Sequence, residues 1–231
     1  KYSLKQKNLK IKIKVFQQFL CLKHMKSEMQ LALKSLDDDF SPDVEKKLSV
    51  LIEELERWNK KINLTAIRDR SKMISLHLLD SLVAAPLIEG DSVLDVGTGS
   101  GFPGLPLAIV QQHRHFTLLD SNNKKIMFVE HMTRLLGLNN VSAIKIRSED
   151  YAPGRGFDTV IARAVASLPK LLQIAGHLAG ENGLFIALKG RYPVKELGQI
   201  EKLKADWSYM VKELCVPGFV KGSRHAVLLR R

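Results

Sequence analysis

Three glycines stand at alternate positions, 97, 99 and 101, directly after the apolar run Ser92–Val96. A short apolar run before such a cluster is typical of a buried strand that ends in a tight turn. Glycine has no Cβ atom and tolerates a positive φ, so the turn lets a ligand approach the backbone closely. The segment therefore predicts a cofactor-binding turn at the carboxyl end of a first strand.

The glycines alone leave the cofactor open between a dinucleotide and S-adenosylmethionine. Gly99–Gly104 matches the dinucleotide fingerprint G-x-G-x-x-G, which is a weak signal by itself. Asp95 lies two residues before the first glycine, where a carboxylate suits an ammonium group and would repel a pyrophosphate. The segment Asp95–Gly101 resembles the first motif of class I S-adenosylmethionine-dependent methyltransferases. This cofactor is therefore favoured, and an NAD-dependent oxidoreductase is the alternative.

Further candidate cofactor contacts follow the next two expected strands. Asp120 comes directly after the run Phe116–Leu119, and a carboxylate there can bind both ribose hydroxyls of either cofactor. Ser148 and Glu149 follow the run Val141–Ile146, where the adenine edge would lie in this class of methyltransferases.

The residues available for methyl transfer favour an acceptor atom that is already nucleophilic. Methylation of a pyrimidine C5 requires an attacking cysteine, but neither Cys21 nor Cys215 follows a candidate ligand-binding strand. The Asn/Asp-Pro-Pro-aromatic loop common in methylation of exocyclic amines is absent from Ile161–Leu168. Guanine N7 and a thiolate remain, and N7 needs no general base because it carries an in-plane lone pair. Arg163 is the candidate for orienting the guanine, since a guanidinium reads guanine O6 and N7 well.

Other polar residues are weaker candidates. Lys189 and Arg224 lie at expected strand ends on the presumed ligand side, where they could contact RNA phosphates. His77 and Asp80 are three residues apart on a helix face, and we interpret them as a structural pair, with His77 also a candidate RNA contact. Histidines such as His113 lack carboxylate or cysteine partners at ligand spacing, so no metal site is expected.

The elements that must position these residues alternate between strand and helix. This alternation predicts a Rossmann-like α/β fold, a mostly parallel sheet with helices on both faces. The expected strands are Ser92–Val96, Phe116–Leu119, Val141–Ile146, Thr159–Ala162 and Gly183–Leu188, and the helices between them are Gly104–Gln112, Asn122–Leu136, Leu168–Ala179 and Val194–Lys204.

The two ends of this domain follow different patterns. The runs Ser208–Val216 and His225–Arg230 have no helix between them and predict an antiparallel pair at the sheet edge. Before the sheet, Ser41-Pro42-Asp43 starts one expected helix, and a second spans Asp69–Leu87. We therefore expect a helical cap over residues 25–90 and the Rossmann-like domain over residues 91–231.

The charge is unevenly distributed over the 231 residues. Lys+Arg 36 against Asp+Glu 24 gives a net charge of +12, which favours a polyanionic partner such as nucleic acid. Residues 1–24 hold seven of the lysines and no acid, so residues 25–231 carry only +5. We interpret residues 1–24 as a basic extension, disordered or foreign to the working protein, and not a secretion signal, because Gln17 and Gln18 interrupt its apolar stretch.

Composition also narrows the cellular setting. No apolar run reaches the roughly 18–20 residues that a membrane span needs. Two cysteines are too few for a disulfide scaffold and indicate a reducing, cytoplasmic location. Nothing in the sequence requires more than a monomer.

Seven segments in order resemble one family, the bacterial ribosomal RNA small-subunit methyltransferase G family, also called the glucose-inhibited division protein B family. They are Trp58–Ile67, His77–Leu82, Leu94–Leu107, Thr117–Ser121, Ala162–Pro169, Ala187–Gly190 and Arg224-His225. Two departures are mild, because Phe102 stands where leucine is usual and Val165 where phenylalanine is usual, and both stay apolar.

The resemblance implies methylation of guanine N7 in 16S ribosomal RNA, within the small ribosomal subunit or an assembly intermediate, with S-adenosylmethionine as donor. It also implies cofactor contacts at Gly97, Phe102, Ser148, Glu149 and Arg163. The alternatives are a methyltransferase that acts on another RNA, a protein or a small molecule, and a non-catalytic RNA-binding assembly factor.

Overall fold

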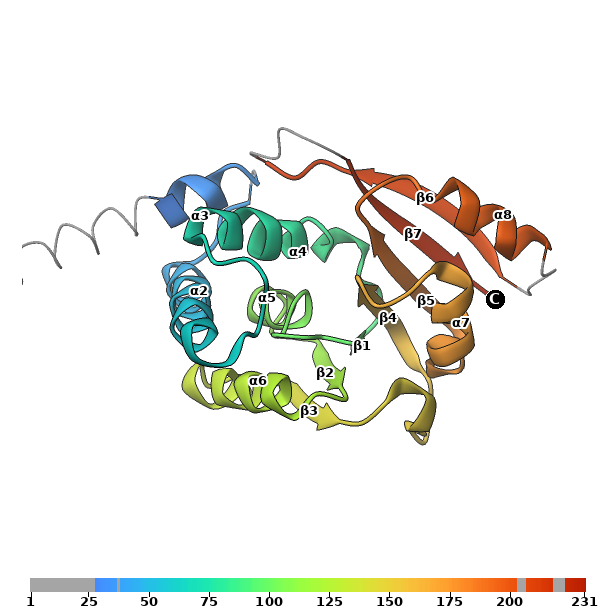
Figure 1. Cartoon of the computed structure of the whole chain (residues 1–231), viewed down its shortest axis with the longest axis horizontal. Helices are drawn as coiled ribbons and strands as arrows, with labels where there is room; N and C mark the ends of the chain where they lie inside the picture. Colours follow the sequence, from blue (N-terminus) through green and yellow to red (C-terminus); the bar gives the residue numbers. More distant parts are fainter. Residues whose placement is uncertain (1–27, 37, 203–206, 218–222) are drawn as a thin grey trace, which may run out of the picture.

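The computed structural model describes residues 28–36, 38–202, 207–217 and 223–231 (Figure 1). The expected basic extension, residues 1–24, lies outside the described residues.

A seven-stranded sheet forms the centre of the protein. Its strands are β1 Ser92–Val96, β2 His115–Asp120, β3 Val141–Lys145, β4 Phe157–Arg163, β5 Ala179–Lys189, β6 Ser208–Leu214 and β7 Arg224–Arg230. The spatial order is β3-β2-β1-β4-β5-β7-β6, in which β1 to β5 are parallel and β7 is antiparallel to both of its neighbours. The predicted Rossmann-like sheet with an antiparallel edge is confirmed. Because the order reverses between β1 and β4, ligands are expected at the carboxyl ends of these two strands.

Helices cover both faces of the sheet (Figure 1). One face packs against α5 (Gly104–Val110), α6 (Asn123–Leu135) and the N-terminal cap, and the other against α7 (Leu168–Ala175) and α8 (Val194–Lys202). Neighbouring residues of one strand alternate between the two resulting cores: Val93 belongs to the first and Leu94 to the second. This period of two is the pattern of a sheet buried on both sides.

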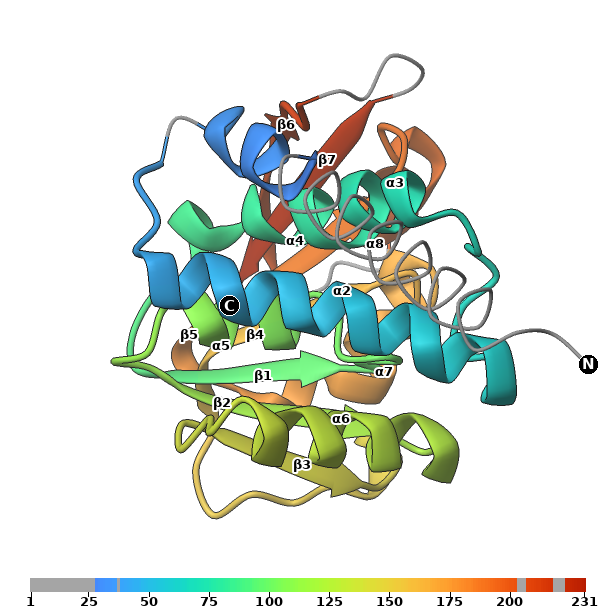
Figure 2. The ribbon, with the colours of Figure 1, turned by 90° about the vertical axis from the view of Figure 1, so that its left-hand side faces the viewer.

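The first predicted cap helix, α2 (Pro42–Ile62), begins as the sequence predicts and follows a short helical segment at residues 28–34. The Ser41 side chain accepts a hydrogen bond from the Val44 amide at 3.4 Å, and Asp43 lies in the first turn. The helix ends at Asn63, whose φ of 40° is left-handed. Figure 2 shows α2 lying across α5 and α6. Its residues Leu48, Leu51 and Leu55 are buried.

The second cap helix is not the continuous α-helix predicted over Asp69–Leu87. It consists of α3 (Arg70–Met73), a π-helical turn at Ile74–Leu79, α4 (Asp80–Leu82) and a separate 3₁₀ turn at Ala85–Leu87. A π-helical turn adds residues to each turn and changes the direction of the side chains that follow. Its position matters because it contains His77 and leads directly into Asp80.

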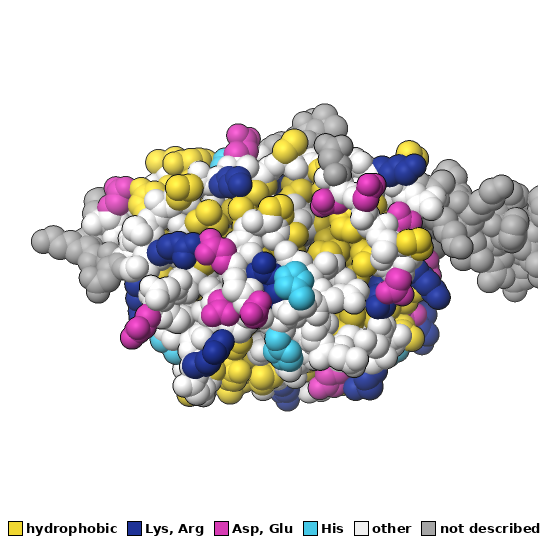
Figure 3. Space-filling view, turned by 180° about the vertical axis from the view of Figure 1, so that it is seen from behind, with side chains coloured by type: hydrophobic (Ala, Val, Ile, Leu, Met, Phe, Trp, Pro, Cys, Tyr) yellow, Lys and Arg dark blue, Asp and Glu magenta, His cyan; other side chains and the backbone are white. Residues whose placement is uncertain are grey.

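Charged groups are mixed on the face seen in Figure 3. Lys and Arg side chains alternate with Asp and Glu among apolar groups, and neither sign forms a continuous patch there. Within the described ranges, no helix is both long and apolar enough to cross a membrane. The same residues contain no group of three or more His, Cys, Asp or Glu side chains that could hold a metal ion.

Candidate functional site

Two adjoining pockets open at the carboxyl edge of the sheet. The first has a volume of about 560 Å³ and the second about 320 Å³. They share Gly97, Lys125 and Ala164. The remaining walls of the first pocket are formed by Leu64, Thr65, Ile67, Leu76, His77, Asp80, Thr98, Gly99, Ser100, Phe102, Arg163, Leu188, Lys189, Gly190, Leu214, Arg224 and His225. Those of the second are Val96, Leu119, Asp120, Ser121, Ile146, Arg147, Ser148, Glu149, Val165 and Ile174.

The glycine-rich turn after β1 provides part of both walls. Gly97 has a φ of +66°, and a Cβ atom there would lie 2.6 Å from Cγ2 of Val165. Gly99 also has a positive φ and faces the Lys125 ammonium group. Glycine at these positions therefore keeps open the space between the turn and the β4 end.

Asp120 is fixed at the rim of the second pocket. Its Oδ2 accepts the Gly99 amide at 3.0 Å and its Oδ1 accepts the Asn122 amide at 2.8 Å. The Lys125 ammonium group lies 3.5 Å from Oδ2. Each carboxylate oxygen has two acceptor positions, so capacity remains for hydroxyl donors.

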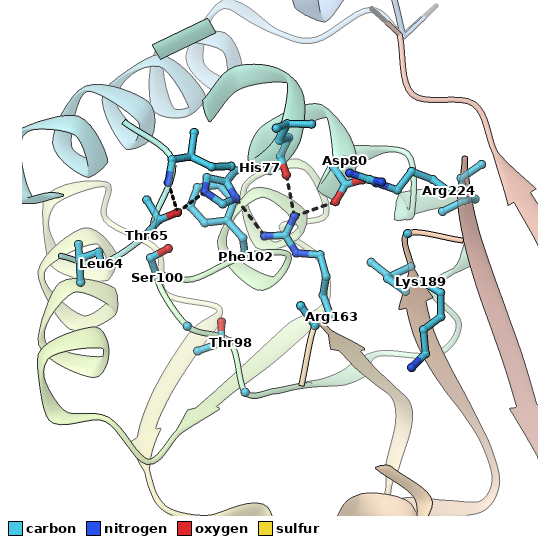
Figure 4. Close-up of a pocket in the computed structure, with 18 of the residues that line it drawn as sticks. Leu64, Thr65, His77, Asp80, Thr98, Ser100, Phe102, Arg163, Lys189 and Arg224 are labelled. Atoms are coloured by element: carbon cyan, nitrogen blue, oxygen red, sulfur yellow. Dashed lines mark hydrogen bonds and ion pairs between the residues drawn. The ribbon is translucent and has the colours of Figure 1, made fainter. Parts of the chain in front are cut away.

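Arg163, at the end of β4, is held by the second cap helix (Figure 4). Its Nη1 donates to the Leu76 carbonyl at 3.0 Å and to Asp80 Oδ2 at 2.8 Å, and its Nη2 lies 3.3 Å from Nδ1 of His77. The His77 ring stacks on Phe102 with centroids 5.1 Å apart. Burial and the nearby guanidinium lower the pKa of His77 to about 4, so the ring is neutral at physiological pH. We call His77, Asp80, Phe102 and Arg163 the Arg163 cluster. In it, the stacked rings of His77 and Phe102 lie beside a guanidinium group whose position is fixed by hydrogen bonds.

Comparison with known proteins identifies the family. The sequence model of the GidB family, described as rRNA small subunit methyltransferase G, matches residues 44–227. The chain is 47% identical over 175 residues to the ribosomal RNA small subunit methyltransferase G of Legionella pneumophila (strain Corby), covering 76% of this chain and 81% of that one.

This chain belongs to the rRNA small subunit methyltransferase G family. It is also 41% identical to the family member of Haemophilus influenzae (strain PittEE), over 89% of this chain and 100% of that one. Among solved structures, it resembles a SAM-dependent methyltransferase from Aquifex aeolicus with a TM-score of 0.56 and 20% identity, over 76% of this chain and 98% of that one. The predicted family membership is confirmed, and the structural likeness supports the fold.

Most predicted site residues of this family member lie in the two pockets. The structure brings Gly97, Gly99, Phe102, Arg163, His77, Lys189 and Arg224 to the first pocket, and Gly97, Asp120, Ser148 and Glu149 to the second. Ser148 is buried and donates to Glu149 Oε2 at 3.0 Å. Their contacts with a cofactor or RNA stay predictions.

Asp95 and Gly101 line neither pocket. Asp95 is fully buried, and its Oδ2 accepts the Gly104 amide at 2.9 Å. Burial raises the pKa of Asp95 to about 6, against the stabilising hydrogen bonds from Thr98 and Gly104. Gly101 has a φ of +86°, and a Cβ atom there would clash with the Leu105 side chain. Both residues therefore support the turn from the core side, and a contact of Asp95 with a ligand ammonium stays a prediction.

Lys189 and Arg224 are engaged with the protein. Lys189 Nζ donates to the Ala166 carbonyl at 2.9 Å and to Glu196 Oε2 at 2.8 Å. Arg224 Nε pairs with Asp80 Oδ1. Phosphate binding by either residue thus requires it to share or exchange these partners.

Sequence reasoning missed three wall residues. Thr65 lies in the family segment Trp58–Ile67, but its residue type alone predicts no role in the site. Lys125 lies in the first helical turn after Asp120, and a cation so close to a predicted ribose ligand is the signal that could have found it. Ala164 has a φ of 56°, unusual for a residue with a Cβ atom, and no sequence signal marks it.

Proposed function

We propose that this protein transfers a methyl group from S-adenosylmethionine to N7 of a guanine in 16S ribosomal RNA, as a cytoplasmic monomer. Its substrate class follows from the family, whose members are named for the ribosomal RNA of the small subunit. The guanine and the N7 atom are inferred from the chemistry of the first pocket.

The second pocket fits the nucleoside part of the donor. Asp120 offers a carboxylate whose orientation is fixed by two backbone amides, which suits two ribose hydroxyls. Ser148 and Glu149 lie in the same pocket and would meet the adenine. The space above Gly97, which a Cβ atom would reduce, connects this pocket with the first. When bound, the donor supplies a methyl group made electrophilic by the positive sulfonium.

The first pocket fits a flat base that carries hydrogen-bond acceptors. Phe102 and His77 present stacked rings, and Arg163 lies beside them with its guanidinium carbon 6.0 Å from the Phe102 centroid. An arginine has five N–H donors, and three of these are used by Leu76, Asp80 and His77 within the described residues. The Nε hydrogen and one Nη2 hydrogen remain for a ligand.

The N7 assignment rests on the hydrogen-bond partners of His77 and Asp80, the two possible proton acceptors beside Arg163. His77 faces Arg163 with Nδ1 and Thr65 with Nε2, and both oxygens of Asp80 are paired with arginines. Neither group is placed to take a proton from an exocyclic amine. Guanine N7 loses no proton on attack, so its methylation needs only correct placement of the base. Arg163 would provide this placement through O6, which leaves the N7 lone pair free to attack the methyl group.

The test is methyl transfer from tritium-labelled S-adenosylmethionine to small ribosomal subunits from cells that lack the activity. The RNA is then digested to nucleosides and the labelled product identified. We expect label in 7-methylguanosine of 16S RNA. Label in protein, in another nucleoside or on another atom of guanine would contradict the proposal, and binding of the donor without any transfer would favour a non-catalytic assembly factor.

A further inference from the structure

Thr65 brings the cap into the first pocket, directly next to the Arg163 cluster (Figure 4). It follows α2 in a segment that is fixed by Asn59, whose Oδ1 accepts the Thr65 amide at 2.9 Å and whose Nδ2 donates to the Ile67 carbonyl at 3.1 Å. Asn59 itself is buried. The position of the Thr65 side chain is therefore set by the fold and does not depend on a ligand.

The neighbours of His77 define which of its nitrogens carries the proton. A guanidinium can only donate, so the Arg163 Nη2 contact at 3.3 Å makes Nδ1 the acceptor. A neutral imidazole with an accepting Nδ1 carries its hydrogen on Nε2. That hydrogen points to Oγ1 of Thr65, 2.9 Å away, so His77 donates and Thr65 accepts.

A second donor fills the remaining acceptor position of Thr65. The Ile67 amide donates to the same Oγ1 at 3.2 Å. A hydroxyl accepts at two lone pairs and donates one hydrogen. With both lone pairs used, the Thr65 hydrogen cannot return to His77 or Ile67, and none of the described residues accepts it. The arrangement leaves one oriented donor at the wall of the pocket.

We propose that Thr65 is a specificity-determining residue whose hydroxyl donates a hydrogen bond to O6 of the target guanine. The inference rests on the proposed function. Guanine presents two adjacent acceptors, O6 and N7, whereas adenine presents an amino donor in place of O6. An adenine in the same orientation would direct its amino donor at the Thr65 hydrogen. Two donors that face each other without an acceptor disfavour binding of the wrong base.

The experiment combines an enzyme variant with altered bases at the target position. Thr65→Val keeps the shape of the side chain and removes the hydroxyl, and Thr65→Ser is the matched control that keeps it. Reconstituted small subunits carry guanosine, inosine or 2-aminopurine riboside at the target. Inosine keeps O6 and lacks the 2-amino group, whereas 2-aminopurine lacks O6 and keeps N7. Both single-turnover rates and RNA dissociation constants are measured.

We expect Thr65→Val to lower the rate or the affinity about tenfold with guanosine and with inosine, as for the loss of one hydrogen bond. With 2-aminopurine the loss caused by Thr65→Val should be much smaller than with guanosine, because the partner atom O6 is already absent and only the bonds to His77 and Ile67 are lost. Thr65→Ser should match the wild type on all three bases. Binding of S-adenosylmethionine should be unchanged throughout.

Two results would overturn the inference. If Thr65→Val costs as much with 2-aminopurine as with guanosine, Thr65 acts only through His77 or the loop. If Thr65→Val has no effect with guanosine, the hydroxyl does not contact the base. Thr65→Ala gives a second test if the valine variant does not fold. Failure of the proposed function is seen separately, because the wild type would then not form 7-methylguanosine.

Discussion

Left-handed backbone conformations gather where the two pockets meet. Gly97, Gly99 and Gly101 have φ between +61° and +86°, and Ala164 has a φ of 56°. A residue with a Cβ atom loses roughly 1–2 kcal/mol in this region, so Ala164 is kept there by the surrounding contacts. It lines both pockets, which places a strained peptide between Arg163 and the exposed Val165.

Gly97→Ala should weaken S-adenosylmethionine binding at least tenfold while the protein stays folded. The new Cβ atom would lie 2.6 Å from Val165, so that side chain must move within the wall shared by the pockets. Gly137→Ala is the matched control, because Gly137 has a similar φ of +61° and nothing within 4 Å of the added Cβ. In both variants the alanine is forced into a left-handed conformation, which destabilises the fold by roughly 1–2 kcal/mol.

Titration calorimetry and thermal unfolding separate the two effects. We expect a similar fall in melting temperature for both variants and a loss of affinity only for Gly97→Ala. Equal affinities in the two variants would show that the glycine is needed for the turn alone.

For single residues, the sequence predicted where the site residues lie better than it predicted their hydrogen-bond partners. Asp120 and the glycines were found because local order, a strand followed by a turn, determines where they lie. The hydrogen bond between the Asp95 side chain and the Gly104 amide could not be predicted, because it joins the end of a buried strand to the start of the next helix. The partners of Arg163 come from a helix more than eighty residues earlier, which no local pattern can indicate.

At the scale of elements, Asp80 connects the cap to two strands of the sheet. Its Oδ2 pairs with Arg163 of β4 and its Oδ1 with Arg224 of β7. The Asp80 side chain is only 8% exposed, so the pairs are shielded from water. One carboxylate thus fixes the relative positions of α4, β4 and β7 around the first pocket.

Asp80→Asn should destabilise the protein by roughly 3 kcal/mol, since it removes a shielded negative charge that pairs with the guanidinium groups of Arg163 and Arg224. Asp43→Asn is the control: Asp43 pairs with Lys47 at 2.7 Å, but its side chain is 64% exposed. An exposed pair contributes at most about 1 kcal/mol. Urea unfolding of both variants gives the comparison, and an Asp80→Asn effect no larger than that of the control would refute the connecting role.

The elements themselves were largely predictable, because strands buried on both faces and helices with clear caps leave strong patterns. Ser92–Val96 was predicted to the residue. The π-helical turn at Ile74–Leu79 was not, since its apolar residues satisfy an α-helical pattern equally well. Tertiary contacts of His77 and Asp80 with Arg163 accompany this turn, and they are absent from any local sequence window.

For the whole molecule, the buried Asp95 and the partly buried His77 give opposite trends of stability with pH. His77 has a folded pKa of about 4 against an ordinary 6.5, so the unfolded chain binds more protons between these values and stability is lost as pH falls. Asp95 has a folded pKa of about 6 against 3.8, so the folded chain binds more protons and stability is lost as pH rises through this range. Each effect amounts to about 3 kcal/mol, and they largely cancel between pH 4 and 6 in the wild type.

Replacing either His77 or Asp95 should reveal the pH dependence of stability that the other residue causes. We expect the free energy of unfolding of His77→Gln to fall as pH rises from 4 to 6, and that of Asp95→Asn to rise over the same range. Urea unfolding at several pH values measures both slopes. If the free energy of unfolding changed with pH in the same way in both variants and the wild type, His77 and Asp95 would not have opposite effects on stability.

The net charge of +12 is a poor guide to the site. Seven of the lysines of the protein lie in residues 1–24, outside the described residues. On the face in Figure 3, positive and negative side chains are mixed. In the first pocket, Arg163, Lys189 and Arg224 each pair with a carboxylate. RNA recognition is therefore expected from a few positioned donors and stacked rings rather than from a broad basic surface.

The place of β7 in the sheet has a consequence for biosynthesis. β7 lies between β5 and β6, and it carries Arg224 and His225 into the first pocket. On a translating ribosome, β6 emerges before the strand that joins it to the sheet, and Asp80 emerges 144 residues before its partner Arg224. A nascent chain can form the walls of the second pocket early, but the first pocket is completed only when β7 is released.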